Sequence, residues 1–451
     1  MATSHSVHDV EVDEQAGYWS LIAGNRNFRR LWAGTVVSLL GDWFNTIALY
    51  VLVTELTGSP LALGGVFLTK MLPWALSAPL AGVLVDRYNR RALMIGTDLV
   101  RAVLVLGFLF IDQPVEVPWL YVLLAAQVVA GAVFTPAKSA SIPNITTPRE
   151  LLTANALMSA TWSTMLAVGA ALGGLAVEVV GIHAVFWIDS VTYLVSAVFI
   201  LGTTIPQDTE PAKRSLVRSA VREIVEGWTH LRQNPRIGRI AFAKATWSIA
   251  GGGLVYMLAL LGERVAPAAL GAGIGVLFMA RGIGTGIGPL LTRWLFQDRR
   301  QWPTVLGGAI AVCGACYVVV GVLPWTATTL GIALLCVFVV AGHAASAGNW
   351  VLSTVMLQKR TTDRLRGRVF STEWLLVMSA ESLSILVGSA LLEAGWLDLA
   401  GAVQAFGLLQ VASGLAWLGI VVPREWADDN LQPRKTDHPP SDEEVPRPET
   451  T

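Results

Sequence analysis

The chain has 451 residues, of which 53% are hydrophobic and only 14% are charged. Soluble domains carry roughly 25% charged residues, so this composition excludes an ordinary water-soluble protein. Basic and acidic side chains balance at 32 each, and a net charge of zero does not indicate a nucleic-acid partner.

Long apolar runs follow one another along the chain. A helix of about 20 apolar residues crosses about 30 Å of hydrocarbon, whereas the strands of a membrane β-barrel are short and alternate in polarity. The runs predict twelve transmembrane helices, over residues 31–54, 61–85, 92–111, 119–140, 151–180, 183–204, 240–261, 269–296, 304–323, 327–356, 369–393 and 397–422. The predicted fold is an all-α integral membrane protein of two six-helix bundles.

Polar segments divide the chain into five parts. We expect residues 1–25 to be a disordered tail, residues 26–205 to form the first bundle and residues 240–423 to form the second. The linker between them, 206–239, has the pattern of an amphipathic helix at a membrane surface. Residues 424–451 are rich in proline and charge and are predicted to be a second disordered tail.

Arginine and lysine gather in the loops on one side of the predicted helices. The loops on the opposite side contain essentially Arg264 alone. Because basic loops are retained in the cytoplasm, we expect a multi-pass protein of the cytoplasmic membrane with both termini inside.

Two short strings recur at equivalent places in the two halves. Residues 82–87 and 288–293 end the second and eighth predicted helices, and residues 147–151 and 361–365 precede the fifth and eleventh. Parallel repeats of this kind occur in membrane transporters, so we predict an internal duplication.

The most specific motif is GVLVDRYNRRALMI, residues 82–95, between the second and third predicted helices. Gly82 permits a close approach of helices, and a charge network of Asp86, Arg87, Arg90 and Arg91 can break and re-form between two arrangements of the bundles. The alternative is that the arginines only follow the bias for basic cytoplasmic loops. The motif resembles the signature loop of the major facilitator superfamily.

Other strings narrow the resemblance to the drug and siderophore exporters of that superfamily, which include macrolide and enterobactin exporters. They are FRRLWAGTVVSLLGDWF, TDLVRA, FTPAKSASIPNITTPRELLTANAL and GRVFS. The likeness extends over residues 26–422. It implies a secondary active transporter that exports amphipathic small molecules by alternating access, as a proton-coupled multidrug or siderophore antiporter.

One departure concerns the fifth helix, where the antiporter signature of the superfamily carries Gly-Pro before a glycine pair. This chain has Gly169, Gly173 and Gly174 but no proline in that run. The glycines still provide a small face for helix packing. The missing proline removes the support of this signature for antiport.

Four ionisable residues are predicted near the middle of the membrane: Asp42, Lys70, Arg281 and Glu381. Each costs roughly 2.5–3.5 kcal/mol at a helix centre, so each needs a partner or a water-filled cavity. We expect Asp42 and Glu381 to carry protons or contact a cation, and Lys70 and Arg281 to pair with them or to meet an anionic substrate. The alternative is buried structural ion pairs.

We make separate predictions for further polar and aromatic residues in the spans. Asp98 and Arg101, three apart on one helix, are predicted to form a structural ion pair. Lys244 is expected to snorkel to the interface, and Glu373 and Asp189 to line the entrance of a path. Aromatic surface for a substrate is expected from Trp43, Trp74, Trp162 and Trp247.

Other functions remain open alternatives. An uptake permease or a lipid or lysolipid transporter would share the fold, and a membrane receptor or a membrane-embedded enzyme belongs to a different class. The histidines are scattered and no Walker A string occurs in the sequence. We therefore expect a protein that is not an enzyme, acts as a monomer, uses no metal or cofactor, and meets membrane lipids, a small-molecule substrate and protons.

Overall fold

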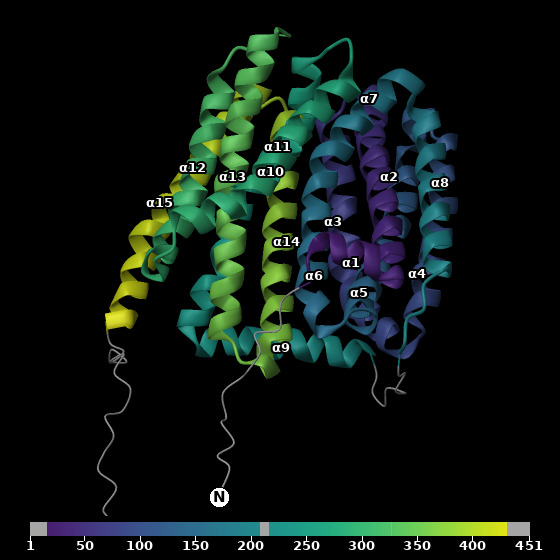
Figure 1. Cartoon of the computed structure of the whole chain (residues 1–451). Helices are drawn as coiled ribbons and strands as arrows, with labels where there is room; N and C mark the ends of the chain where they lie inside the picture. Colours follow the sequence, from purple (N-terminus) through teal and green to yellow (C-terminus); the bar gives the residue numbers. More distant parts are fainter. Residues whose placement is uncertain (1–15, 208–215, 326, 431–451) are drawn as a thin grey trace, which may run out of the picture.

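The computed structural model describes residues 16–207, 216–325 and 327–430 (Figure 1). Within these ranges no strand occurs, and twelve helical segments are long and apolar enough to cross a membrane. The predicted all-α fold with twelve membrane helices is confirmed.

The first bundle contains six membrane-spanning segments, the fifth of which is interrupted by a π-helical turn at Met165–Gly169. The segments are α2 (Arg26–Thr57), α3 (Pro60–Arg87), α4 (Arg90–Leu106), α5 (Val117–Ile145), α6 (Pro148–Thr164) with α7 (Ala170–Val180), and α8 (Ile182–Leu201). The second bundle contains α10 (Pro235–Val265), α11 (Leu270–Leu295), α12 (Trp302–Val322), α13 (Thr329–Arg360), α14 (Asp363–Glu393) and α15 (Leu399–Asn430).

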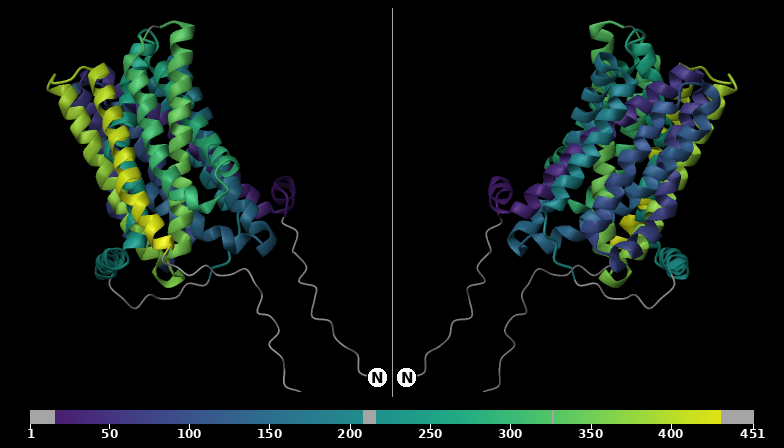
Figure 2. Two further views of the ribbon diagram at one scale, coloured as in Figure 1. Left: turned by 90° about the vertical axis from the view of Figure 1, so that its left-hand side faces the viewer. Right: turned by 90° about the vertical axis from the view of Figure 1, so that its right-hand side faces the viewer.

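Two further helices lie at one end of the molecule, which we call the α9 end; the opposite end is the far end. Helix α9 (Leu216–Gln233) runs across this end, and α1 (Tyr18–Gly24) lies there on the other side of the bundles (Figures 1 and 2). Glu226 on α9 forms an ion pair of 2.6 Å with Arg368 at the start of α14. The predicted amphipathic linker helix is therefore anchored to the second bundle.

Helix starts follow capping rules, and one of the repeated strings contains such a start. Asn25 accepts a hydrogen bond from the Phe28 amide at 2.9 Å before α2. Thr147 and Glu150 form a capping box before α6. Such caps satisfy amide groups that have no partner within the helix.

The apolar core is distributed unequally between the two ends. At the far end one buried cluster takes side chains from both bundles, including Ile47–Val53 of α2 and Ile274–Phe278 of α11. At the α9 end each bundle has its own separate cluster. The bundles are therefore joined at the far end and apart at the α9 end.

Small residues and hydrogen bonds make the junction at the far end. A Cβ atom on Gly174 of α7 would lie 3.1 Å from Cα of Gly275 on α11. The Tyr256 hydroxyl of α10 donates to the Pro60 carbonyl oxygen at 2.7 Å, and the Ser59 hydroxyl donates to Glu393 of α14 at 2.7 Å. These contacts hold the two bundles together at the far end.

The predicted N-terminal tail 1–25 is wrong in its last part. Residues 18–24 form α1, and Leu21 is fully buried among apolar side chains of the first bundle. The apolar stretch YWSLIAG has a place to pack, which the sequence pattern did not reveal. Residues 1–15 lie outside the described residues.

The predicted C-terminal boundary is also wrong, because α15 continues to Asn430. The carboxylate of Glu425 is fully buried and lies 2.6 Å from both Arg239 and Arg360. Asp428 is paired with Arg239 and lies 3.8 Å from Arg236. These partners from α10 and α13 hold residues 424–430 as helix; residues 431–451 lie outside the described residues. Likewise α10 begins at Pro235, inside the segment predicted as linker.

We predict that Glu425→Gln lowers the stability of the folded chain strongly. Removing one partner of a buried ion pair costs about 3–5 kcal/mol, because the remaining charges lose their compensation. The apparent melting temperature in detergent measures the effect. Glu263→Gln, at an exposed far-end position of α10, is the control. Equal melting temperatures for the two variants would contradict a structural role of the Glu425 cluster.

Candidate functional site

A cavity of about 450 Å³ lies between the two bundles near the middle of the membrane-spanning helices. Its lining residues come from α2, α3, α4, α5, α6 and α8 of the first bundle and from α10, α11 and α14 of the second. Phe67 and Phe278 both pack against Tyr50 on its far-end side, with ring centroids 4.5 and 5.8 Å from that of Tyr50. The aromatic cluster separates the cavity from the far end.

The four ionisable residues predicted near mid-membrane all line this cavity. Asp42 and Lys70 approach from α2 and α3, and Arg281 and Glu381 approach from α11 and α14. The structure therefore brings together residues that are far apart in sequence, with one acid and one base from each bundle. Arg101 of α4 also lines the cavity.

A hydrogen-bonded network surrounds Asp42 in the first bundle. The Tyr193 hydroxyl of α8 donates to Asp42 Oδ1, and Gln127 of α5 donates to the Tyr193 hydroxyl at 3.0 Å. The Asn45 side chain donates to Gln127 Oε1 at 3.2 Å. Asn45 and Gln127 are amides within predicted spans, a signal that the sequence reading overlooked; nothing in the sequence distinguished Tyr193.

Arg101 joins the predicted Asp98 pair to this network. Its guanidinium forms an ion pair with Asp98 and lies 3.9 Å from Asp42 Oδ1. It also lies over the rings of Tyr193 and Phe134, at 4.3 and 4.7 Å from their centroids. The Asp98–Arg101 contact is therefore present, and through Arg101 it reaches the cavity.

Lys70 reaches Asp42 through one hydroxyl group. The Lys70 ammonium donates to Thr46 Oγ1 at 2.5 Å, and Thr46 Oγ1 donates to the Asp42 carbonyl oxygen at 2.6 Å. This path ends on the main chain of Asp42 and not on its carboxylate, so it holds the Lys70 ammonium beside α2 on the cavity wall.

The charged groups of the second bundle are less completely bound. Glu381 accepts one long hydrogen bond of 3.5 Å from the Ser248 hydroxyl. Arg281 lies 6.0 Å from the Phe278 centroid, and its Nε atom is buried with no hydrogen-bond partner among the described residues. Buried polar groups normally have hydrogen-bond partners. Arg281 and Glu381 can therefore still form hydrogen bonds with a ligand or with water.

Aromatic side chains complete the walls. Trp43, Trp74 and Trp162 line the cavity as expected. Trp247 does not: it is buried and packs at 6.2 Å against the Trp350 ring in an edge-to-face contact. The cavity thus combines apolar aromatic surface with both signs of charge.

Three expectations for charged residues outside the cavity are wrong. Lys244 does not snorkel, because its ammonium is buried 3.0 Å from the Glu373 carboxylate and 5.3 Å from the Trp350 ring. Glu373 is only 1% exposed and lines no entrance. Asp189 is fully buried and accepts a hydrogen bond from Thr192. Lys244 and Glu373 are partners on two different helices, whereas the partner of Asp189 lies on its own helix α8.

Two arginines of the motif at residues 82–95, Arg90 and Arg91, bind the ends of helices in the first bundle. Arg90 donates to the Ala140 carbonyl oxygen at 2.8 Å and to Asn144 at 2.9 Å near the end of α5. Arg91 donates to the carbonyl oxygens at the end of α8. Positive charge is favourable at helix C-termini, so these residues link the loop to two helix ends.

In this arrangement the glycine of the same motif has space beside it, and the acid is exposed. A Cβ atom on Gly82 would meet nothing within 4 Å among the described residues, and Asp86 is exposed. The close helix approach predicted at Gly82 is therefore absent here. The separation of the bundles at the α9 end explains this, because no helix of the second bundle reaches Gly82.

The glycines of the fifth span pack closely, within and across the bundles. A Cβ atom on Gly169 would lie 2.9 Å from Cβ of Trp43, and one on Gly173 would lie 3.1 Å from Cα of Phe44. Gly174 faces α11 instead, as described above. The glycine run fits close packing of α7 between α2 and α11.

Residues 31–372 match the family described as the Major Facilitator Superfamily. The chain is 27% identical over 409 residues to BacE of Bacillus subtilis, whose name proposes it as a bacilysin exporter, covering 90% of this chain and 96% of BacE. It is 30% identical over 226 residues to macrolide efflux protein A of Streptococcus pyogenes, covering 49% and 54% of the two chains.

Solved structures share the fold at low sequence identity. A bacterial homologue of the human lysosomal transporter Spinster, in an inward-facing and unoccupied conformation, superposes with a TM-score of 0.66 at 15% identity, covering 93% of this chain and 100% of that one. The family match extends over more than half of the sequence and agrees with the twelve-helix architecture. This chain belongs to the major facilitator superfamily.

Proposed function

We propose that this chain exports amphipathic small molecules across the cytoplasmic membrane by alternating access, in exchange for protons. The observation that carries the proposal is the cavity between the bundles, which is sealed at the far end and carries acids and bases from both bundles. Its volume of about 450 Å³ falls within the usual range of small-molecule sites.

The α9 end is the cytoplasmic end in this proposal. Helix α9 and the loops at this end carry most of the arginines and lysines, and basic loops are retained in the cytoplasm. The described arrangement is then an inward-facing state. A substrate enters the cavity from the cytoplasm and leaves after the bundles rock and the far end opens.

Amphipathic substrates fit the walls of the cavity. The aromatic side chains of Trp43, Trp74 and Trp162 offer apolar surface, and the free capacity of Arg281 and Glu381 offers polar contacts. Two relatives carry the words exporter and efflux in their names. Export is therefore preferred to uptake, although the same fold serves both directions.

Proton exchange is assigned to Asp42 and Glu381. Each carboxylate lies at the wall of a cavity that faces the cytoplasm in this state, and carboxylates inside membranes commonly form proton relays. Each also has a cation on the wall of the same cavity, Lys70 for Asp42 and Arg281 for Glu381. Loss or gain of a proton therefore changes the charge that a substrate meets.

Replacing either carboxylate by its amide should remove proton-driven transport. The substrate is first found by comparing the compounds that cells with and without the gene release, by mass spectrometry. In inside-out vesicles, we expect accumulation of that compound to collapse with a protonophore, and to fall to the level of empty vesicles for Asp42→Asn or Glu381→Gln. Asp112→Asn, at an exposed far-end acid, should transport as the original chain does.

Two outcomes would contradict the assignment. Accumulation that ignores the protonophore would remove proton exchange while leaving export intact. Unchanged transport by one amide variant would reduce that carboxylate to a structural role.

Alternating access predicts opposite effects of bulky residues at Gly82 and Gly174. A Cβ atom at Gly82 meets nothing within 4 Å among the described residues, and we expect leucine there to obstruct closure of the α9 end. Leucine at Gly174 instead clashes with α11 and should open the far end. Overpacking costs about 1–3 kcal/mol, which corresponds to a shift in population of about 5–150-fold. The reporter is Ser389→Cys, a buried far-end position, in a chain without other cysteines.

The rate of alkylation of the reporter should fall for Gly82→Leu and rise for Gly174→Leu. Gly419→Leu, on an open face of α15, should leave the rate unchanged. Changes in the same direction for both variants would contradict a rocking motion.

A further inference from the structure

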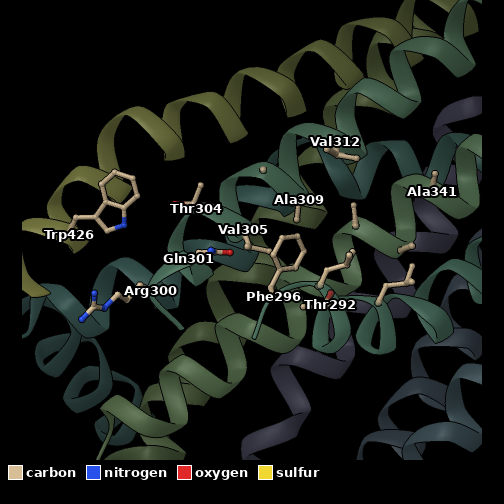
Figure 3. A pocket seen from close by; sticks show the side chains of 16 residues that line it. Thr292, Phe296, Arg300, Gln301, Thr304, Val305, Ala309, Val312, Ala341 and Trp426 are labelled. Carbon is tan, nitrogen blue, oxygen red and sulfur yellow. The ribbon is translucent and has the colours of Figure 1, made fainter. Parts of the chain in front are cut away.

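A second and larger hollow lies on the side of the second bundle, away from the central cavity. It has a volume of about 1090 Å³ and is formed by α11, α12, α13 and the last turns of α15, with the 3-10 turn η4 (Arg299–Gln301) at its α9 end (Figure 3). We call it the lateral groove. None of its lining residues lines the central cavity.

The walls of the lateral groove are apolar and suited to a hydrocarbon chain. Small residues such as Gly308, Ala309 and Ala344 form its floor, which leaves room between the helices. The groove is open at the side, because Leu295 and Val312 are 54% and 51% exposed. A side opening in a membrane-spanning bundle faces lipid and not water, so lipid chains are the molecules that reach it.

The α9 end of the groove is polar and basic. Arg300, Gln301 and Thr304 line it there, and Figure 3 shows Arg300 and Gln301 with Trp426 at that end. Arg300 is exposed, and no described carboxylate lies within ion-pair distance of its guanidinium; the Asp298 carboxylate accepts a hydrogen bond from the Arg300 backbone amide at 2.9 Å. The buried Thr304 hydroxyl has no hydrogen-bond partner among the described residues.

Neighbouring charges leave this rim positive. The carboxylates beside Trp426 on α15, Glu425 and Asp428, are occupied by arginines of α10 and α13. The ammonium of Lys359 lies 5.3 Å over the Trp302 ring, next to η4. Basic pockets between membrane helices at the cytoplasmic surface suit anionic head groups.

We propose that the lateral groove binds an anionic phospholipid of the leaflet at the α9 end. One acyl chain lies along α11, α12 and α13, and the phosphate meets Arg300 and Gln301, with the Thr304 hydroxyl as a further donor. The proposal needs only the membrane-spanning fold, and it is independent of what the central cavity transports.

The test measures lipid retention by native mass spectrometry of the full chain purified in detergent. Phosphatidylglycerol and phosphatidylcholine with identical acyl chains are added at equal concentrations. We expect retention of phosphatidylglycerol over phosphatidylcholine, and we expect Arg300→Gln to reduce this preference about fivefold, the worth of one basic side chain near an anionic surface. Arg264→Gln, which removes an exposed arginine at the far end, should leave the preference unchanged.

A second variant tests the place of the acyl chain. A Cβ atom on Gly308 would meet nothing within 4 Å among the described residues, and Gly308 lines the groove, so Gly308→Leu places its side chain in the groove. It should lower retention of both lipids, whereas Gly419→Leu on the open face of α15 should not. Melting temperatures without added lipid verify that all variants remain folded.

Three results would overturn the proposal. They are equal retention of the two lipids by the original chain, unchanged retention in Gly308→Leu, and displacement of phosphatidylglycerol by glycerol phosphate. The last result would mean that a soluble anion occupies the basic rim without a chain in the groove.

Discussion

The close approach of the two bundles at the far end is the contact on which the rest of the structure depends. Gly174 on α7 meets Gly275 on α11 with no side chain between their backbones, and Gly64 on α3 faces Ser389 on α14. Helices in lipid associate through such small residues because apolar burial alone favours neither protein nor lipid. With one end joined, the separation of the bundles at the other end creates the cavity between them.

The treatment of charge differs between the cavity and its surroundings. Away from the cavity, several buried charges are paired, as in Lys244 with Glu373 and in the arginines around Glu425. Around the cavity, the first bundle binds Asp42 in a network, while Arg281 and Glu381 of the second bundle have few partners. A charged side chain with few hydrogen-bond partners is costly in a membrane. This cost supports a functional role for Arg281 and Glu381.

The central cavity and the lateral groove suit two different kinds of small amphipathic molecule. The cavity is enclosed between the bundles and carries acids as well as bases, so it suits a substrate that must also leave. The groove opens toward lipid and has a basic rim, which suits a lipid that stays. The cavity lies near the middle of the membrane-spanning helices, and the groove extends to the α9 end of the second bundle.

Much of the fold could be predicted from the sequence, because the length of an apolar run is a local property. Twelve apolar runs are enough to predict twelve helices. Charged residues within these runs are enough to indicate sites near the middle of the membrane. Boundaries such as α1 and the last turns of α15 could not be predicted, since Leu21 in α1 and Glu425 in α15 are held by partners distant in sequence. The sequence by itself determined which charged residues lie within the spans and must therefore avoid lipid. Only the tertiary structure decided that Arg101 reaches Asp42 while Lys244 is neutralised by Glu373, because ion pairing depends on distances between helices that no local pattern records.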